Sequence, residues 1–185
     1  MKKFFSDYGY SCVKIFVNQF AIALFGVSLV IAVSALDNEH SGWLVYLVSA
    51  LSVLFYLILI YSIPWNHGAK DRISVDYQKK DKNLLLGLYM GLVANIPNVL
   101  VALLSGVLRM AGAISTSEGL RGIGVALQGM YLGLLQFKIG ETSLNAYWWM
   151  ILVVMIPSIV TSALAYIAGY NNIRVFKFKE QRKYY

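Results

Sequence analysis

The sequence predicts an all-α, polytopic integral membrane protein: a four-transmembrane-helix bundle with one extra amphipathic or re-entrant helix in the outer loop. Three observations predict this fold. The 185-residue chain is 58% hydrophobic and 14% charged, whereas a soluble domain is about half apolar and about a quarter charged. The apolar residues are collected in long uncharged runs, and most basic residues are collected in three segments outside those runs. Because this pattern extends over residues 1–185, we expect a single membrane domain.

The long apolar runs are the predicted spans. A helix needs about 20 apolar residues to cross a bilayer, and four runs have that length. Trp43 and Trp148 lie at predicted outer ends and Trp65 lies at an inner end, as expected of aromatic residues that anchor a helix at the membrane interface. The four spans cover about residues 15–36, 43–63, 84–108 and 147–170.

The distribution of lysine and arginine predicts the orientation, because cytoplasmic segments carry an excess of both. Of the 16 basic residues, 13 fall in the N-terminal arm, in a loop at residues 64–83 and in a tail at residues 171–185. Four spans place these three segments on one side. We therefore predict a multi-pass protein of the cell (cytoplasmic) membrane with cytoplasmic N and C termini, a basic cytoplasmic loop and a basic cytoplasmic tail.

The same basic residues predict a lipid partner. A lysine or arginine near an anionic membrane surface gains roughly 1 kcal/mol, so we expect contacts with anionic headgroups or with a partner protein. The net charge of +7 comes from the basic residues that set the orientation of the chain in the membrane. No nucleic acid is therefore expected as a partner. The residues predicted to make these contacts are Lys70, Arg72, Lys79, Lys80, Lys82, Arg174, Lys177 and Lys179.

A fifth apolar segment, at residues 119–137, is weaker. It contains Arg121 and its uncharged core is shorter than a usual span. As a full span it would place the basic tail outside, so we predict a helix that lies on the outer surface. A re-entrant helix lining a cavity and a true fifth span are the alternatives. Ser115 and Glu118 have the spacing of a capping box ahead of this helix. Its stripe of small residues consists of Gly122, Ala126, Gly129 and Gly133.

Small and polar residues share one face of the third predicted span. Pro97 has no N–H and clashes with the preceding turn, so the carbonyl of Val93 loses its partner and a kink is expected. An amide that faces hydrocarbon without a partner costs several kcal/mol, so we expect Asn95 and Asn98 to point into the protein. The whole face consists of Gly87, Gly91, Asn95, Asn98, Ala102 and Ser105.

Each of the other spans also presents one small or polar face, of the kind that lets membrane helices pack closely. The three faces consist of Ser158, Ser162, Ala165 and Gly169 in the fourth span, of Asn18, Ala21, Ser28 and Ala32 in the first, and of Ser49, Ser52 and Tyr56 in the second.

Two interpretations of these polar residues are possible. In the first they form hydrogen bonds between packed helices, which average about 0.6 kcal/mol. In the second they line a solute or ion site near mid-membrane, as broken helices do in transporters. The candidates for a pathway or for helix packing are Asn95, Pro97, Asn98, Gly87, Gly91, Ser158 and Ser162.

Catalytic and metal-binding patterns are missing from the sequence. The two histidines, His40 and His67, lie on opposite predicted sides of the membrane, and no Cys/His cluster has the spacing of metal ligands. The predicted spans hold no charged residue away from their ends, where a proton-coupled pump usually has one. We therefore expect no metal, no cofactor and no enzymatic activity.

The sequence leaves two functions to consider. The first is a non-enzymatic membrane subunit that assembles with itself or with another membrane protein, as a homo- or hetero-oligomer, through its small-residue faces and basic loop. The second is an oligomeric channel or a small-solute transporter component whose pathway lies at the kinked third span. Four short spans enclose little volume, so both functions predict an oligomer or a partner chain.

Overall fold

The computed structural model describes residues 2–35, 42–79 and 81–173. These residues form a helical structure with one two-stranded antiparallel hairpin, in which Lys138 pairs with Ser143. The elements are α1 (Lys2–Ala35), α2 (Gly42–Asp76), α3 (Leu86–Ala94), α4 (Ile96–Met110), α5 (Ile114–Leu127), η1 (Gly129–Tyr131), α6 (Leu132–Leu135), β1 (Lys138–Ile139), β2 (Thr142–Ser143), η2 (Leu144–Ala146), α7 (Met150–Val153) and α8 (Ile156–Tyr170).

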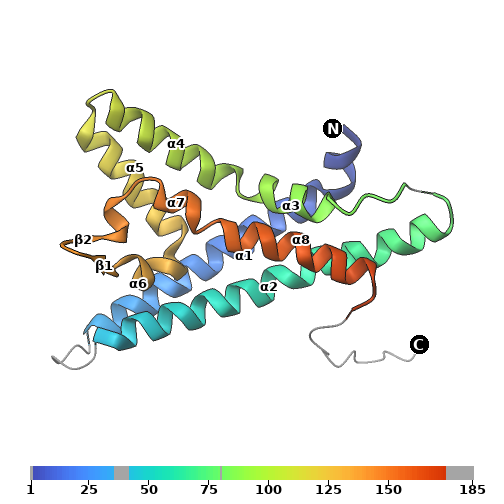
Figure 1. Ribbon diagram of the computed structural model, residues 1–185, viewed down its shortest axis with the longest axis horizontal. Coiled ribbons are helices and arrows are strands. Elements are labelled where there is room, and N and C mark those ends of the chain that lie inside the picture. The colour runs from blue at the N-terminus through green and yellow to red at the C-terminus, as the bar shows by residue number, and fades with distance from the viewer. Residues whose placement is uncertain (1, 36–41, 80, 174–185) are drawn as a thin grey trace.

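Three helical segments are long and apolar enough to cross a membrane, and a fourth is present if the bent pair α3–α4 counts as one span. The three are Phe4–Ala35, Gly42–Asp76 and Met150–Tyr170, and the two axes of the bent pair differ by 52°. Figure 1 shows α1 and α2 side by side along the length of the molecule, with α8 packed on α2 and α3. The fold class is therefore all-helical with several apolar helices, as the sequence predicts.

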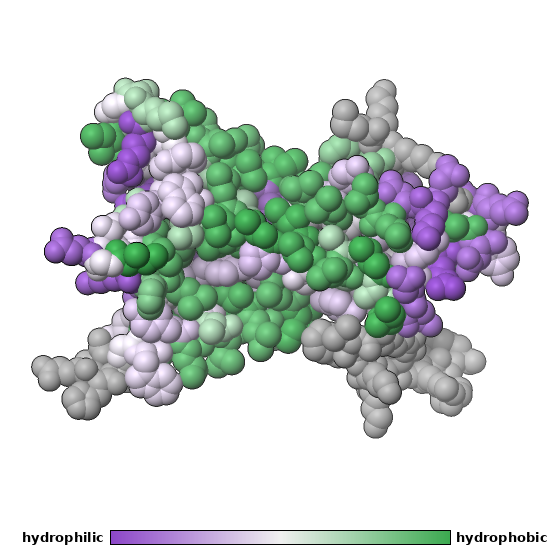
Figure 2. Space-filling model, in the orientation of Figure 1, coloured by the Kyte–Doolittle hydropathy of each residue, from purple (hydrophilic) through white to green (hydrophobic). Residues whose placement is uncertain are grey.

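The surface is apolar around the middle of the molecule. Figure 2 shows hydrophobic residues across the centre of one face and hydrophilic residues gathered at its two ends. Large apolar side chains on several helices are about half exposed, among them Leu24 of α1, Leu54 of α2 and Leu164 of α8. Monomeric soluble proteins rarely expose such a continuous apolar area, whereas a bilayer covers it.

Helix α2 continues well past the predicted span. The sequence places a loop at residues 64–83, but the structure is helical to Asp76 with Pro64 inside the helix. Close packing on α8 accounts for this continuity. A Cβ on Gly68 would lie 2.8 Å from the backbone nitrogen of Tyr170, and a Cβ on Gly169 would lie 2.7 Å from the carbonyl carbon of Trp65. The two backbones therefore touch on the far side of the proline, and this packing stabilises the extra turns.

The buried face of α1 differs from the predicted one. Ala21, Ser28 and Ala32 are exposed, and the Ser28 hydroxyl donates a 2.9 Å hydrogen bond to the Leu24 carbonyl of its own helix. A serine satisfied in this way needs no partner on another helix. The buried face is set instead by Gly26, where a Cβ would lie 2.6 Å from the Cα of Met130. The residues buried on this face are Ile15, Gln19, Ile22, Ala23, Gly26 and Val30.

The segment predicted as one helix at residues 119–137 is broken. Its first helix, α5, begins at Ile114 after the N-cap residue Ala113, so Ser115 lies inside the first turn and makes no capping hydrogen bond. Glu118 pairs instead with Arg121, at 2.9 Å. The helix ends before Gln128, and the turn at η1 redirects the chain into α6.

The break in this segment also divides its small-residue stripe. Gly129 is buried against Ala23 of α1. Gly133 is buried on α2, where its N–H donates a 2.8 Å hydrogen bond to the Ser49 hydroxyl. Gly122 and Ala126, in contrast, are exposed. Only the later half of the predicted stripe therefore packs within the chain.

Candidate functional site

The bend between α3 and α4 centres on Asn95. Its N–H bonds to the carbonyls of Gly91 (3.2 Å) and Leu92 (3.1 Å), and its side-chain Nδ2 donates a further 2.9 Å hydrogen bond to the Gly91 carbonyl. Pro97 stands in the first turn of α4, where its missing N–H needs no partner. The proline thus starts a new helix, and the Asn95 amide caps the end of the old one.

The two asparagines also connect this bend to α8. Asn95 Nδ2 donates to the Ser158 hydroxyl at 3.0 Å, and Asn98 Nδ2 donates to Asn95 Oδ1 at 3.2 Å. The Ser158 hydroxyl in turn donates to the Met155 carbonyl at 2.8 Å. Asn95, Asn98 and Ser158 are each at most 1% exposed. A continuous chain of hydrogen bonds therefore runs from α4 through the end of α3 to the start of α8.

A second helix break lies opposite the first. Helix α7 ends at Val153 and α8 begins at Ile156, with Pro157 in its first turn. The chain therefore reads Ile-Pro-Asn at residues 96–98 and Ile-Pro-Ser at residues 156–158. Since α3 packs on α8 while α4 packs on α7, the two segments run in opposite directions with their interruptions side by side. The α7–α8 interruption is the milder one, because Met150–Tyr170 counts as one span, whereas the axes of α3 and α4 differ by 52°. The repeated Ile-Pro-polar triplet is a sequence signal of this arrangement.

Gly87 and Gly91 hold α3 against α8. A Cβ on Gly87 would lie 2.6 Å from the Ser162 carbonyl oxygen, and a Cβ on Gly91 would lie 3.1 Å from the Cα of Ile159. Both glycines are buried, as are Ser158 and Ser162. The predicted small-residue faces of the third and fourth spans therefore meet each other inside one chain.

Several polar atoms around these breaks lack a hydrogen-bond partner in the described part of the chain. They include Asn98 Oδ1, the Tyr56 and Tyr131 hydroxyls and the Ser162 hydroxyl. The Tyr56 hydroxyl lies beside Ser158 and Tyr131, although it forms no hydrogen bond of acceptable geometry with either. We call the six residues the central polar cluster: Tyr56, Asn95, Asn98, Tyr131, Ser158 and Ser162.

Two buried glutamines outside the central polar cluster also have unpaired amide atoms. Gln19 of α1 and Gln128, at the α5–η1 break, are each 1% exposed. Neither Nε2 atom has a partner among the described residues, and neither does Gln19 Oε1. Folded proteins satisfy more than about 90% of buried polar groups, so this concentration of unpaired groups is unusual. The site residues predicted from the sequence include the asparagines and serines but not Gln19, Gln128 or Tyr131.

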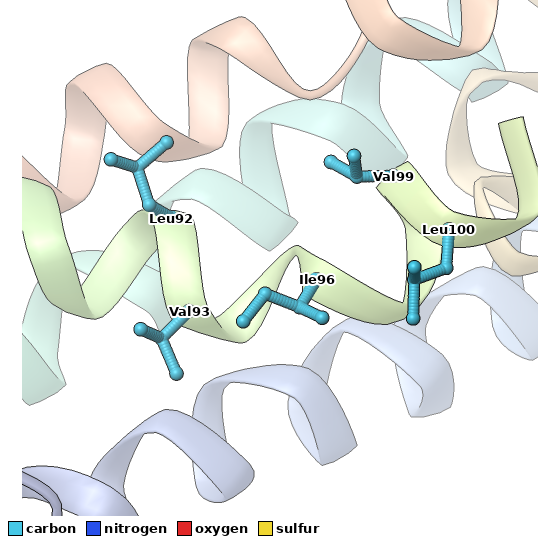
Figure 3. A pocket seen from close by; sticks show the side chains of 5 residues that line it. All are labelled: Leu92, Val93, Ile96, Val99 and Leu100. Atoms are coloured by element: carbon cyan, nitrogen blue, oxygen red, sulfur yellow. The ribbon is translucent and has the colours of Figure 1, made fainter. Parts of the chain in front are cut away.

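An apolar groove of about 410 Å³ lies on the exposed side of the α3–α4 bend. Figure 3 shows its lining side chains along the bend. Leu92 and Ile96 are each 46% exposed and Leu100 is 54% exposed, so the groove opens outward. The bend thus presents hydrocarbon on one side and the central polar cluster on the other. The residues lining the groove are Leu92, Val93, Ile96, Val99 and Leu100.

A second buried polar group lies where α1, α2 and α8 meet at one end of the molecule. The carboxylate of Asp71, which is 7% exposed, accepts hydrogen bonds from the Tyr8 hydroxyl and from the Tyr166 hydroxyl at 2.8 Å. The Ser11 hydroxyl lies 2.6 Å from His67 Nε2. These contacts tie three helices together, and no sequence pattern pointed to them.

Four of the basic residues predicted to contact headgroups, Lys70, Arg72, Lys79 and Lys82, are exposed at this same end. Arg72 donates to the Tyr170 carbonyl at 3.2 Å, and the Lys82 ammonium lies 5.6 Å from the centre of the Tyr170 ring. Both cations therefore interact with the last residue of α8, where the helix dipole favours positive charge. The other four predicted residues, Lys80, Arg174, Lys177 and Lys179, lie outside the described residues.

Within residues 2–35, 42–79 and 81–173, no group of three or more His, Cys, Asp or Glu side chains is arranged to hold a metal ion. The central polar cluster contains amides and hydroxyls but no charged group. Comparisons with protein-family models, with curated proteins and with solved structures find no match for this chain.

Proposed function

We propose that this chain is a non-enzymatic channel or transporter component that passes a small solute through the central polar cluster. One observation carries the proposal. Four buried atoms of this cluster, Asn98 Oδ1 and the hydroxyls of Tyr56, Tyr131 and Ser162, have no partner in the described chain. An unpaired amide or hydroxyl in an apolar environment costs a few kcal/mol. A solute or water molecule that hydrogen-bonds to these groups offsets the cost, whereas direct helix contacts do not.

The helix breaks support the same proposal. Paired discontinuous helices that run in opposite directions are a common way of building a solute site near mid-membrane. Here the Asn95 amide is used to cap α3 and to hold Ser158, which fixes the two breaks relative to each other. The unpaired groups of Asn98 and Ser162 are then presented from a rigid support.

The topology that we propose has four spans, with α3–α4 as one of them and both termini in the cytoplasm of a cell. The charge asymmetry supports it.

The path of α5 to α6 also supports this topology. Gly129 contacts Ala23, which lies about 18 Å along α1 from its end at Ala35. The hydrocarbon core is about 30 Å thick, so the α5–η1 break reaches about mid-membrane. Gly133 returns to Ser49, about 10 Å from the start of α2. We propose that this segment is re-entrant.

A second candidate function, as a subunit of a homo- or hetero-oligomeric complex, is favoured by a different surface. The predicted interface through Gly87, Gly91, Ser158 and Ser162 is occupied within the chain. An exposed stripe of small residues remains on α5, and a Cβ on Gly119 or Gly122 would meet nothing within 4 Å. Such stripes let helices of different chains approach closely. The stripe consists of Ser115, Gly119, Gly122 and Ala126.

A flux measurement tests the primary proposal. The purified protein is reconstituted into vesicles, and the permeability to a panel of small solutes and ions is compared with that of protein-free vesicles. We expect a protein-dependent flux that disappears in the double variant Asn95→Leu with Asn98→Leu. The variant must have the same particle size in detergent as the parent protein. An intact double variant with unchanged flux would show that the amides only join helices.

A further inference from the structure

We infer that the solute of the central polar cluster is a small uncharged molecule that both donates and accepts hydrogen bonds, such as a polyol or urea, and that the cluster excludes inorganic ions. This inference rests on the proposed function and specifies its substrate class. It follows from the kinds of polar atoms that the cluster leaves unpaired and from the charges that it lacks.

The unpaired groups include both donors and acceptors. Asn98 Oδ1 can only accept a hydrogen bond, while the hydroxyls of Tyr56, Tyr131 and Ser162 can donate or accept. Gln128 Nε2, three residues before Tyr131 in the chain, can only donate. A ligand that satisfies all of them needs hydroxyl or amide groups of its own. A ligand with acceptors alone, or with donors alone, would leave part of the cluster unsatisfied.

The charge distribution disfavours an ion. The cluster is formally neutral, and a charge near the bilayer centre is costly without a counter-charge. The buried carboxylate of Asp71 lies at the end of the bundle, where it accepts hydrogen bonds from Tyr8 and Tyr166. A neutral solute avoids this penalty.

The arrangement also separates binding groups from supporting groups. Both hydrogens of the Asn95 amide group are engaged, one by the Gly91 carbonyl and one by Ser158. Asn98 donates to Asn95 but keeps its oxygen free of partners in the described chain. We therefore assign Asn95 and Ser158 to support, and we assign Asn98, Ser162 and Tyr56 to solute binding.

Two serine variants provide a matched test of this assignment. Ser162→Ala removes an unpaired hydroxyl from the cluster. Ser105→Ala removes an equally buried hydroxyl that donates to the Ser117 carbonyl at 3.1 Å, between α4 and α5. We expect Ser162→Ala to slow neutral-solute flux up to about tenfold, as the loss of one hydrogen bond in the pathway would, with little change in thermal stability. We expect Ser105→Ala to lower thermal stability and to leave flux unchanged.

The experiment uses the full chain in vesicles. Glycerol and urea entry is followed by stopped-flow light scattering, and K⁺ and Cl⁻ flux is followed with ion-sensitive dyes in the same preparation. Two results together would support the inference. The protein admits glycerol or urea and Ser162→Ala slows that entry, while the K⁺ and Cl⁻ flux does not exceed the flux into protein-free vesicles. Ion flux without neutral-solute entry would overturn the substrate class while leaving a pathway in place. Vesicles impermeable to all four probes would overturn the class and the proposed function together.

Discussion

The hydroxyl of Tyr166 on α8 donates a 2.8 Å hydrogen bond to the carboxylate of Asp71 on α2. Tyr8 of α1 donates to the same carboxylate oxygen, so one buried acid joins the three helical segments that are each long and apolar enough to cross a membrane. The contacts lie at the end where the basic residues gather. This group therefore joins the helices at one end of the bundle.

The Tyr166→Phe variant tests this junction. The change removes one donor from a buried carboxylate and keeps the ring, so we expect a loss of about 1–3 kcal/mol of folding free energy. Thermal unfolding of the detergent-solubilised protein measures it. The control is Tyr89→Phe, which removes a hydroxyl from a residue that is 44% exposed on α3. Equal unfolding midpoints for the two variants would contradict a stabilising role for the junction.

Glycine variants test the contact between α2 and α8. In Gly169→Ala the new methyl group would collide with the backbone of Trp65, because its Cβ would lie 2.7 Å from the Trp65 carbonyl carbon. We expect a loss of about 1–3 kcal/mol of stability. Gly119→Ala places the same methyl group in open space on α5, where replacing glycine in a helix gains about 0.5–1 kcal/mol. Opposite shifts of the unfolding midpoint are thus expected. A stable Gly169→Ala protein would mean that α2 and α8 lie further apart.

Cysteine labelling tests the orientation and the spanning role of the bent pair. Glu141→Cys and Tyr77→Cys are made separately in a Cys12→Ala background, and both positions are exposed on the molecule. A membrane-impermeant maleimide should label residue 141 in intact cells, and residue 77 only after permeabilisation. The same accessibility at both positions, whether in intact cells or only after permeabilisation, would mean that the chain between them crosses the membrane an even number of times, so that either α3–α4 does not span or residues 119–137 span as well. The reverse pattern would mean an inverted protein.

The buried faces of the third and fourth spans could be predicted from the sequence for a physical reason. Polar and small residues at helical spacing in an apolar run favour the interior of the protein. Asn95 bonds there to Ser158 of the facing helix α8, and Asn98 bonds to Asn95. The same rule was wrong for α1, because Ser28 is satisfied by a carbonyl of its own helix. There the close approach of Gly26 to η1 decides which face is buried.

Other features could not be predicted because they depend on contacts between distant segments. The junction at Asp71 joins residues from α1, α2 and α8, and His67 pairs with a serine 56 positions away. No local pattern brings these residues together. The helical extension past Pro64 likewise depends on packing against α8, since the local effect of proline is to end a helix.

The final prediction concerns the exposed stripe on α5 and separates the two candidate functions. In the double variant Gly119→Leu with Gly122→Leu, two bulky side chains cover a surface on which a Cβ now meets nothing within 4 Å. If the stripe joins chains, we expect the particle mass in detergent, measured by light scattering, to fall while the unfolding midpoint of each chain is unchanged. Gly91→Leu is the contrasting variant, because its side chain would collide with Ile159 and Ser162 inside the chain, and it should lower the midpoint. A double variant with the parent mass would exclude the stripe as an interface.

A monomeric double variant that still passes solute would place the whole pathway inside one chain, since the central polar cluster is built from α2, α4, η1 and α8 of the same molecule. Loss of flux together with loss of the oligomer would mean that a second copy completes the pathway.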